Sequence, residues 1–273
     1  MPIEYIQLAL GPIFISFIAF EYWRHKERYL GRDTFNNVVL AVTFQVAEIL
    51  SLLAILPLFY WLYQFRWFEI ELTPLNLLLA FVVQDFLYYW FHRCSHRVHW
   101  LWCAHVVHHS SALMNFSTAF RQSLLYPVAG MWLFWLPLVW LGYDPKLVLA
   151  VVGLNLGYQF FVHTKWTGKL PIFQWWFNTP SHHRVHHGRN PIYIDKNYAG
   201  VLMIWDRMFG TFQAELKHEP VRFGVIGFME TKRWTVMVIH QWRYMFQQLR
   251  RVDGAKAKLK VLFGPPTHQS CRR

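Results

Sequence analysis

The sequence predicts an all-α integral membrane protein, with four or five transmembrane or re-entrant helices and a helical cap on the cytosolic side. Three features indicate this class: 55% of the 273 residues are hydrophobic, only 15% are charged, and the apolar residues gather in long continuous runs. A soluble domain carries about a quarter charged residues. The same figures exclude a disordered chain, a collagen and a coiled coil.

Five apolar runs are candidates for these helices. The runs at 38–65 and 75–91 are long enough to cross a bilayer, whereas the run at 5–20 needs its flanks to do so. The last two runs, 124–141 and 147–162, are separated by the turn-forming sequence GYDPK. They are therefore predicted to form a helical hairpin that enters the membrane and returns.

The charges of the loops predict which ends are cytoplasmic. The loop at 21–37 contains four Lys and Arg residues, whereas the loop at 66–74 contains one Arg and two Glu. Because Lys and Arg are in excess in cytoplasmic loops, the first loop is predicted to be cytoplasmic. The run at 75–91 then returns to the cytoplasmic side at His92.

The chain is basic, with 27 Lys and Arg against 15 Asp and Glu, and the excess is greatest at its end. The segment 242–273 has eight Lys and Arg residues against Asp253 alone. Beside membrane spans, such a tail predicts contact with anionic lipid at the cytoplasmic face rather than with nucleic acid. Aromatic and basic residues alternate over 229–251, as in an interfacial helix.

Eleven of the fifteen histidines lie between residues 92 and 187. Residues spaced by three and four share one helix face, so each histidine cluster presents two or three imidazoles to a common point. Neutral imidazole binds Fe, Zn, Cu and Ni. Because one such ion takes roughly four to six ligands, the set predicts two metals. The candidate ligands are His92 and His96, then His105, His108 and His109, then His163, and finally His183, His186 and His187.

Two further histidines are assigned outside this set. His182 is adjacent to His183 and does not share its helix face. It is therefore expected to support a ligand histidine without binding the metal itself. His99 breaks the spacing and is expected to be a supporting or surface residue.

Several functional classes are excluded by missing motifs. The sequence has no HExxH motif of a zinc protease, no CxxCH haem motif, no phosphate-binding loop and no GxGxxG motif. Its three cysteines form neither a CxxC motif nor a disulfide framework. Redox chemistry would therefore need a separate electron donor. Three interpretations stay open: an O2-activating diiron site that oxidises lipid, a zinc hydrolase of lipid esters, and a non-enzymatic membrane metal-binding protein.

The histidine spacing resembles that of the fatty acid hydroxylase/sterol desaturase superfamily, whose HxxxH, HxxHH and second HxxHH boxes match in order over about residues 80–215. The stretches NTPSHHRVHHGRN at 178–190 and DKNYAG at 195–200 are similar to alkylglycerol monooxygenases, as are HHSS at 108–111 and TAFRQS at 118–123. The resemblance implies a four-helix membrane core with a cytosolic cap, two irons, O2 and a lipid substrate. It implies tetrahydropterin or another external reductant. Hydroxylase members often carry a further histidine where this chain has Gln159, which puts the second metal's ligand set in question.

Five other residues are candidates for supporting roles. Asp85 lies two helical turns before His92 and is expected to orient a ligand histidine or to bridge helices. Asp195 and Asn197 are expected to form a turn or to support ligands. Arg121 and Asn115 are candidates for binding a lipid headgroup or for fixing the cap.

The sequence thus predicts a membrane-bound diiron oxygenase that hydroxylates or desaturates a lipid C–H bond with O2 and external electrons. Residues 1–74 are expected to form N-terminal transmembrane helices, residues 75–215 the catalytic domain and residues 216–273 a basic interfacial segment. The active site is expected on the cytoplasmic face, in a bacterial inner membrane in preference to an endoplasmic reticulum. The sequence does not predict the lipid, the electron donor or the oligomeric state.

Overall fold

The computed structural model describes residues 3–227 and 233–266. Over these residues the chain is helical, with isolated bridges in place of strands, which confirms the all-α prediction. Cys271, Arg272 and Arg273 of the predicted basic tail lie outside the described residues.

Four long helices match the predicted apolar runs: α1 (Ile3–Arg24), α2 (Gly31–Tyr63), α3 (Pro74–Arg97) and α7 (Pro145–Val162). By length and composition, α2, α3 and α7 are able to cross a membrane. Local sequence explains where two of them begin, because the side chains of Thr73 and Asp144 accept hydrogen bonds from the first turns of α3 and α7, each followed by a proline.

The outer surface of α2 is apolar, as expected for a helix that contacts lipid. Val42, Val46, Leu50 and Leu53 are all exposed on it. A soluble protein rarely exposes so long an apolar surface. Its other side contributes Ile55 and Phe59 to a core formed with α3, α6 and α7.

The first arm of the predicted hairpin is not one helix. Its run divides into α5 (Tyr126–Ala129), the 3-10 helix η3 (Met131–Trp135) and α6 (Leu136–Leu141). The break has a local cause, since Gly130 adopts a left-handed conformation with φ of +80° and each α-helical piece has a proline as its second residue. The second arm, α7, is continuous.

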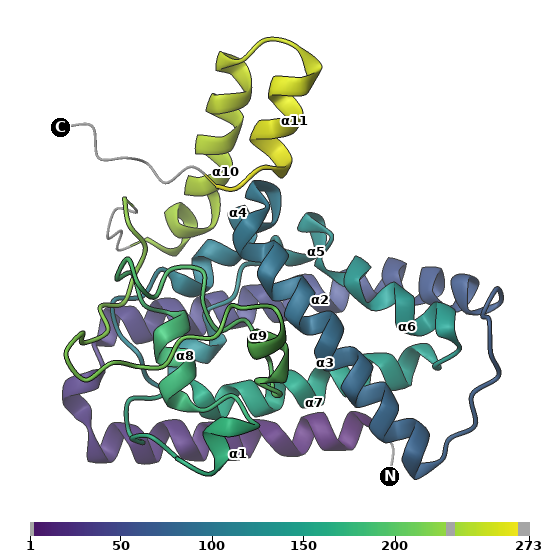
Figure 1. The fold of residues 1–273 in the computed structure, drawn as a ribbon, viewed down its shortest axis with the longest axis horizontal. Coiled ribbons are helices and arrows are strands. Elements are labelled where there is room, and N and C mark those ends of the chain that lie inside the picture. Colours follow the sequence, from purple (N-terminus) through teal and green to yellow (C-terminus); the bar gives the residue numbers. More distant parts are fainter. Residues whose placement is uncertain (1–2, 228–232, 267–273) are drawn as a thin grey trace.

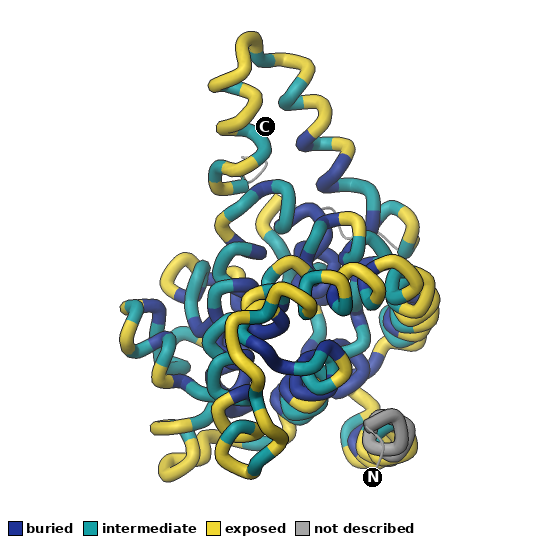
Figure 2. Tube along the Cα trace, turned by 90° about the vertical axis from the view of Figure 1, so that its right-hand side faces the viewer, coloured by how far each residue is buried: buried dark blue, intermediate teal, exposed yellow. Residues whose placement is uncertain are grey.

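Shorter elements gather where α3 and α7 end. These are α4 (His99–His109), η2 (Phe116–Phe120), α8 (Pro180–His186) and α9 (Ile204–Met208), with η1 (Lys26–Arg28) and η4 (Phe173–Trp175) in the connecting loops. α4 packs closely against α3 and α10. Figure 2 shows that the buried chain segments lie in the middle of the body.

The last two helices, α10 (Trp234–Arg251) and α11 (Ala255–Phe263), form a hairpin that extends out of the body. It runs across the direction of α1 and α2 in Figure 1, and it stands clear of the body again in Figure 2. α10 is strongly amphipathic: Met237, Val238 and Met245 are buried, whereas Arg250 and Arg251 are exposed.

Candidate metal centre

All nine predicted ligand histidines are buried and converge at one place, where the ends of α3 and α7 meet α4 and α8. They divide into two groups, and within each group the candidate ligand atoms lie within 4.8 Å of one another. The five-histidine set is His92, His96, His105, His109 and His186, and the four-histidine set is His108, His163, His183 and His187.

The two HxxHH motifs are shared between the sets in a reciprocal way. On α4, His105 and His109 belong to the five-histidine set and His108 to the other. On α8 the pattern is reversed, since His183 and His187 belong to the four-histidine set. In both motifs the residues four apart occupy one helix face and the intermediate histidine projects to the neighbouring set. The two sets are therefore adjacent.

In each set, one ring nitrogen lies within hydrogen-bonding distance of two other ring nitrogens. Nε2 of His183 lies 2.8 Å from Nε2 of His163 and 3.0 Å from Nε2 of His187. In the other set, Nε2 of His105 lies 3.1 Å from that of His92 and 3.2 Å from that of His109. A neutral imidazole nitrogen offers either one proton or one lone pair. It therefore cannot satisfy two neighbouring nitrogens.

A bound cation resolves this conflict. A cation accepts a lone pair from each of several nitrogens at once, so closely spaced Nε2 atoms need no protons between them. Nε2 of His96 and of His186 is buried and has no hydrogen-bond partner. Such atoms are costly unless they bind something. Both sets consist of histidine alone among the described residues, a nitrogen-rich environment that fits a transition metal.

Burial keeps these imidazoles neutral, as metal ligands must be. Burial lowers the pKa of His163 to about 4. Burial, and then the proximity of other histidines, lowers the pKa of His108, His109 and His187 well below the ordinary value. At neutral pH their lone pairs are available.

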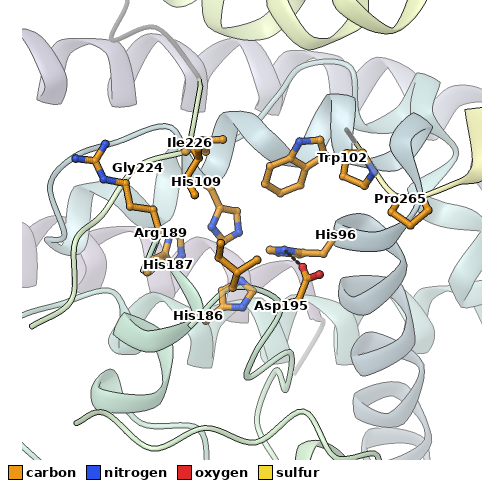
Figure 3. Close-up of a pocket in the computed structure, with 14 residues that line it drawn as sticks. His96, Trp102, His109, His186, His187, Arg189, Asp195, Gly224, Ile226 and Pro265 are labelled. Atoms are coloured by element: carbon orange, nitrogen blue, oxygen red, sulfur yellow. Dashed lines mark ion pairs between the residues drawn. The ribbon is translucent and has the colours of Figure 1, made fainter. Parts of the chain in front are cut away.

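A pocket of about 270 Å³ leads to the five-histidine set. Figure 3 shows the rings of His96, His109 and His186 at its wall, with Trp102 nearby. Arg189 and Asp195 supply charged groups to the same pocket. The five-histidine set is therefore accessible from outside.

Backbone carbonyls hold several ligand rings from behind. Nδ1 of His92 is 2.8 Å from the carbonyl oxygen of Tyr198, and Nδ1 of His186 is 3.0 Å from that of Lys196. Since a carbonyl only accepts, each Nδ1 carries the proton and each Nε2 keeps its lone pair toward the centre. Nδ1 of His163 is held likewise by the carbonyl of Gln159, at 2.6 Å.

Asp85 supports the ligand rings indirectly, through backbone groups of the loop that follows Tyr198. Its carboxylate accepts hydrogen bonds from the backbone N–H groups of Val201 and Leu202, from the Trp205 indole and from Asn155. The expectation that it accepts directly from a histidine ring is therefore wrong, while its helix-bridging role agrees with these contacts. It fixes the loop that carries the Tyr198 carbonyl.

Asp195, Asn197 and His182 support the same region without entering either set. Asp195 and Asn197 adopt left-handed conformations, with φ of 60° and 57°, in agreement with the predicted turn. Asp195 pairs with Arg97 at 2.8 Å and lies 3.8 Å from Nδ1 of His96. The Asn197 amide donates to the carbonyl of His182.

Arg121 and Asn115 are used within the fold. Arg121 is 1% exposed and pairs with Asp33 at 2.7 Å, while its own carbonyl lies 3.3 Å from Nδ1 of His108. Asn115 is fully buried, donates to the carbonyl of Arg28 and caps η2. Neither has a free group for a headgroup, which corrects the substrate-binding expectation in favour of the cap-fixing role.

Gln159 and His99 also lie outside the sets. The Gln159 amide donates to Asn155, and its oxygen accepts from the Tyr88 hydroxyl. His99 lies between the Val261 carbonyl and Gln241. The four-histidine set thus forms without a side chain from position 159.

Two supporting carboxylates were not predicted. Asp206 accepts from the backbone N–H groups of Tyr198 and Ala199. Glu215 pairs with Arg184 of α8 at 2.7 Å and so holds the helix that carries His183 and His186 and is followed by His187. The sequence gives no partner for either carboxylate, so neither role could be predicted from it.

Comparison with known proteins agrees with this geometry. Residues 77–211 match the model of the fatty acid hydroxylase family. This chain belongs to that family. It is 47% identical to the alkylglycerol monooxygenase of Danio rerio over 192 residues, covering 69% of this chain and 41% of the relative. It is 36% identical to that of Homo sapiens over 270 residues, covering 96% of this chain and 60% of the relative.

The name of a more distant relative also refers to a lipid substrate. The ornithine lipid hydroxylase OlsE of Rhizobium tropici is 27% identical over 155 residues, which cover 56% of this chain and 46% of the relative. The chain spans about 40–60% of the length of these relatives. No solved structure matches it.

Proposed function

We propose that this family member is a membrane-bound, O2-dependent oxygenase that hydroxylates or desaturates a lipid. The observation that carries the proposal is the pair of adjacent, all-histidine sets at the ends of two candidate membrane spans. A zinc hydrolase site usually includes carboxylate ligands, and neither set has one among the described residues.

The nine histidines are the proposed ligands of two irons, five at one centre and four at the other. Two bound irons would supply the capacity to activate O2 and to attack an unactivated C–H bond. The protein's part is to keep the imidazoles neutral by burial and to aim their Nε2 atoms with backbone carbonyls.

The proposed substrate is a lipid. Within this class we favour a glycerol ether, because the names of the alkylglycerol monooxygenases indicate such a substrate. Apolar residues beside the site, among them Tyr88, Phe91 and Trp135, belong to the core between the spans. An acyl or alkyl chain would share this environment. Electrons would come from a separate donor, tetrahydropterin or another reductant, because the sequence has no nucleotide-binding motif of its own.

The proposed orientation has the metal centre on the cytoplasmic side, as the loop charges predict. Residues 75–215 would form the catalytic domain. The α10–α11 hairpin of the interfacial segment would lie along the cytoplasmic bilayer surface, since it runs across the direction of α2 and α7 (Figure 1).

The deciding experiment measures metal content and lipid oxidation in the detergent-purified protein after growth in iron-replete medium. Two irons per chain, together with O2- and reductant-dependent loss of an alkylglycerol, would support the proposal. His108→Ala and His186→Ala each remove a ligand from a different set and are expected to abolish oxidation while membrane insertion persists. Bound zinc with anaerobic ester cleavage would indicate the hydrolase, and bound metal with no lipid change the non-enzymatic protein.

A further inference from the structure

The outer ring nitrogen of His105 has a different kind of partner from those of His92, His163 and His186. Among the hydrogen bonds of the described residues, the outer nitrogens of His92, His163 and His186 face backbone carbonyls. Nδ1 of His105 instead lies 2.6 Å from the hydroxyl of Tyr126. It is the ligand ring held by a side-chain hydroxyl.

Tyr126 is well fixed for this role. It is the first residue of α5 and its backbone N–H donates to the carbonyl of Ser123. Its ring is 9% exposed and packs edge-on against Phe44 of α2. The hydroxyl therefore reaches His105 from a rigid turn at the edge of the core.

The chemistry of the pair sets the direction of its hydrogen bond. Nε2 of His105 points to the centre of the five-histidine set, between the Nε2 atoms of His92 and His109. For Nε2 to bind a metal as neutral imidazole, Nδ1 must hold the proton. The Tyr126 oxygen then accepts this proton in a hydrogen bond, and without it a buried N–H would have no partner.

We propose that Tyr126 is a positioning residue of the five-histidine set, which orients His105 through its hydroxyl. The inference rests on the metal binding in the proposed function, but not on the lipid reaction. Loss of such an outer hydrogen bond typically weakens metal affinity 10–100-fold. Because Tyr126 contacts His105 and no histidine of the other set in the described contacts, the effect is expected at one metal only.

The test is a titration of metal-free, detergent-purified protein with Co²⁺, which reports each site through its visible absorption. Tyr126→Phe keeps the ring that packs on Phe44 and removes the hydroxyl. It is expected to bind two Co²⁺ at saturation, with one dissociation constant raised about 10–100-fold and the other unchanged.

Tyr193→Phe is the matched control. Tyr193 is also buried, and its hydroxyl bonds to the backbone of Leu216 and Glu219 rather than to a histidine. It is expected to leave both dissociation constants unchanged. Equal weakening in both variants would mean that any lost buried hydroxyl disturbs the site, and would overturn the proposal.

A double-mutant cycle separates positioning from general destabilisation, and it also covers the case in which Tyr126→Phe folds poorly. In a His105→Ala background, Tyr126→Phe is expected to cause no further loss of affinity at the five-histidine set. A further loss of similar size would refute action through His105. Wild-type protein that binds no Co²⁺ would refute both this inference and the metal site. Site-selective weakening without lipid oxidation would leave this inference standing and contradict only the oxygenase.

Discussion

The imidazole rings of His109 and His187 stack with their centroids 4.3 Å apart and an angle of 24° between their planes, although each belongs to a different ligand set. His105 and His108, which also belong to different sets, lie 5.6 Å apart between centroids. The two sets therefore contact each other through their imidazole rings and do not lie in separate parts of the protein. This proximity favours a dinuclear centre over two independent structural sites.

The unequal size of the sets predicts unequal tolerance to ligand loss. His187→Ala leaves three histidines in its set, whereas His109→Ala leaves four in the other. Since a four-coordinate site is complete with four protein ligands, we expect His109→Ala to retain most of both metals and His187→Ala to lose about half of the total. Elemental analysis of the purified variants gives the metal-to-protein ratio. Equal losses, or loss of both metals from either variant, would contradict the division into sets.

Gly200 is expected to be essential for the geometry of the five-histidine set. A Cβ at this position would lie 2.8 Å from Cδ1 of Tyr88 and 3.0 Å from Oδ1 of Asp85, in addition to a clash with Asn155. The loop would have to move, and it carries the Tyr198 carbonyl that holds His92. Overpacking of this kind costs about 1–3 kcal/mol.

We therefore expect Gly200→Ala to lower the melting temperature and to weaken metal binding at the five-histidine set. Gly168→Ala is the control, because a Cβ there meets nothing within 4 Å. If Gly200→Ala matched Gly168→Ala in both melting temperature and metal affinity, the loop would not position His92.

The ligand histidines could be predicted from sequence because their signal is local. His105 and His109 are four residues apart, so helix geometry alone places them on one face. The division between sets could not be predicted, because it depends on how α4 and α8 face each other. The roles of the Tyr198 and Lys196 carbonyls in holding ligand rings could not be predicted either, since every residue has a backbone carbonyl. For Arg121 the sequence leaves both a headgroup role and a cap-fixing role open for a related reason: its partner Asp33 is 88 positions away in the chain.

Arg121 is predicted to stabilise the fold rather than to bind substrate. Its guanidinium bonds to Asp33 and to Asn37 of α2. Removing one partner of a buried ion pair costs about 3–5 kcal/mol, so Arg121→Met should strongly lower the melting temperature in detergent. Arg222→Met is the control, since its pair with Glu219 is solvent-exposed and worth about 1 kcal/mol or less. A stable Arg121→Met protein with a raised KM for lipid would restore the headgroup role.

The α10–α11 hairpin is predicted to lie on the bilayer with one side of α11 inserted. Leu259 and Phe263 are exposed and four residues apart, so they share a face, whereas Lys256 and Lys260 occupy the next one.

In anionic vesicles, a nitroxide label on Leu259→Cys should be relaxed mainly by O2, which partitions into the acyl chains. A label on Lys256→Cys should be relaxed mainly by a water-soluble nickel chelate. Before labelling, the native cysteines must be replaced or shown to be unreactive. They are Cys94 and Cys103 among the described residues, and Cys271. Equal access of the chelate to both labelled positions would show that the hairpin projects into water, and its basic residues would then need a different partner from lipid.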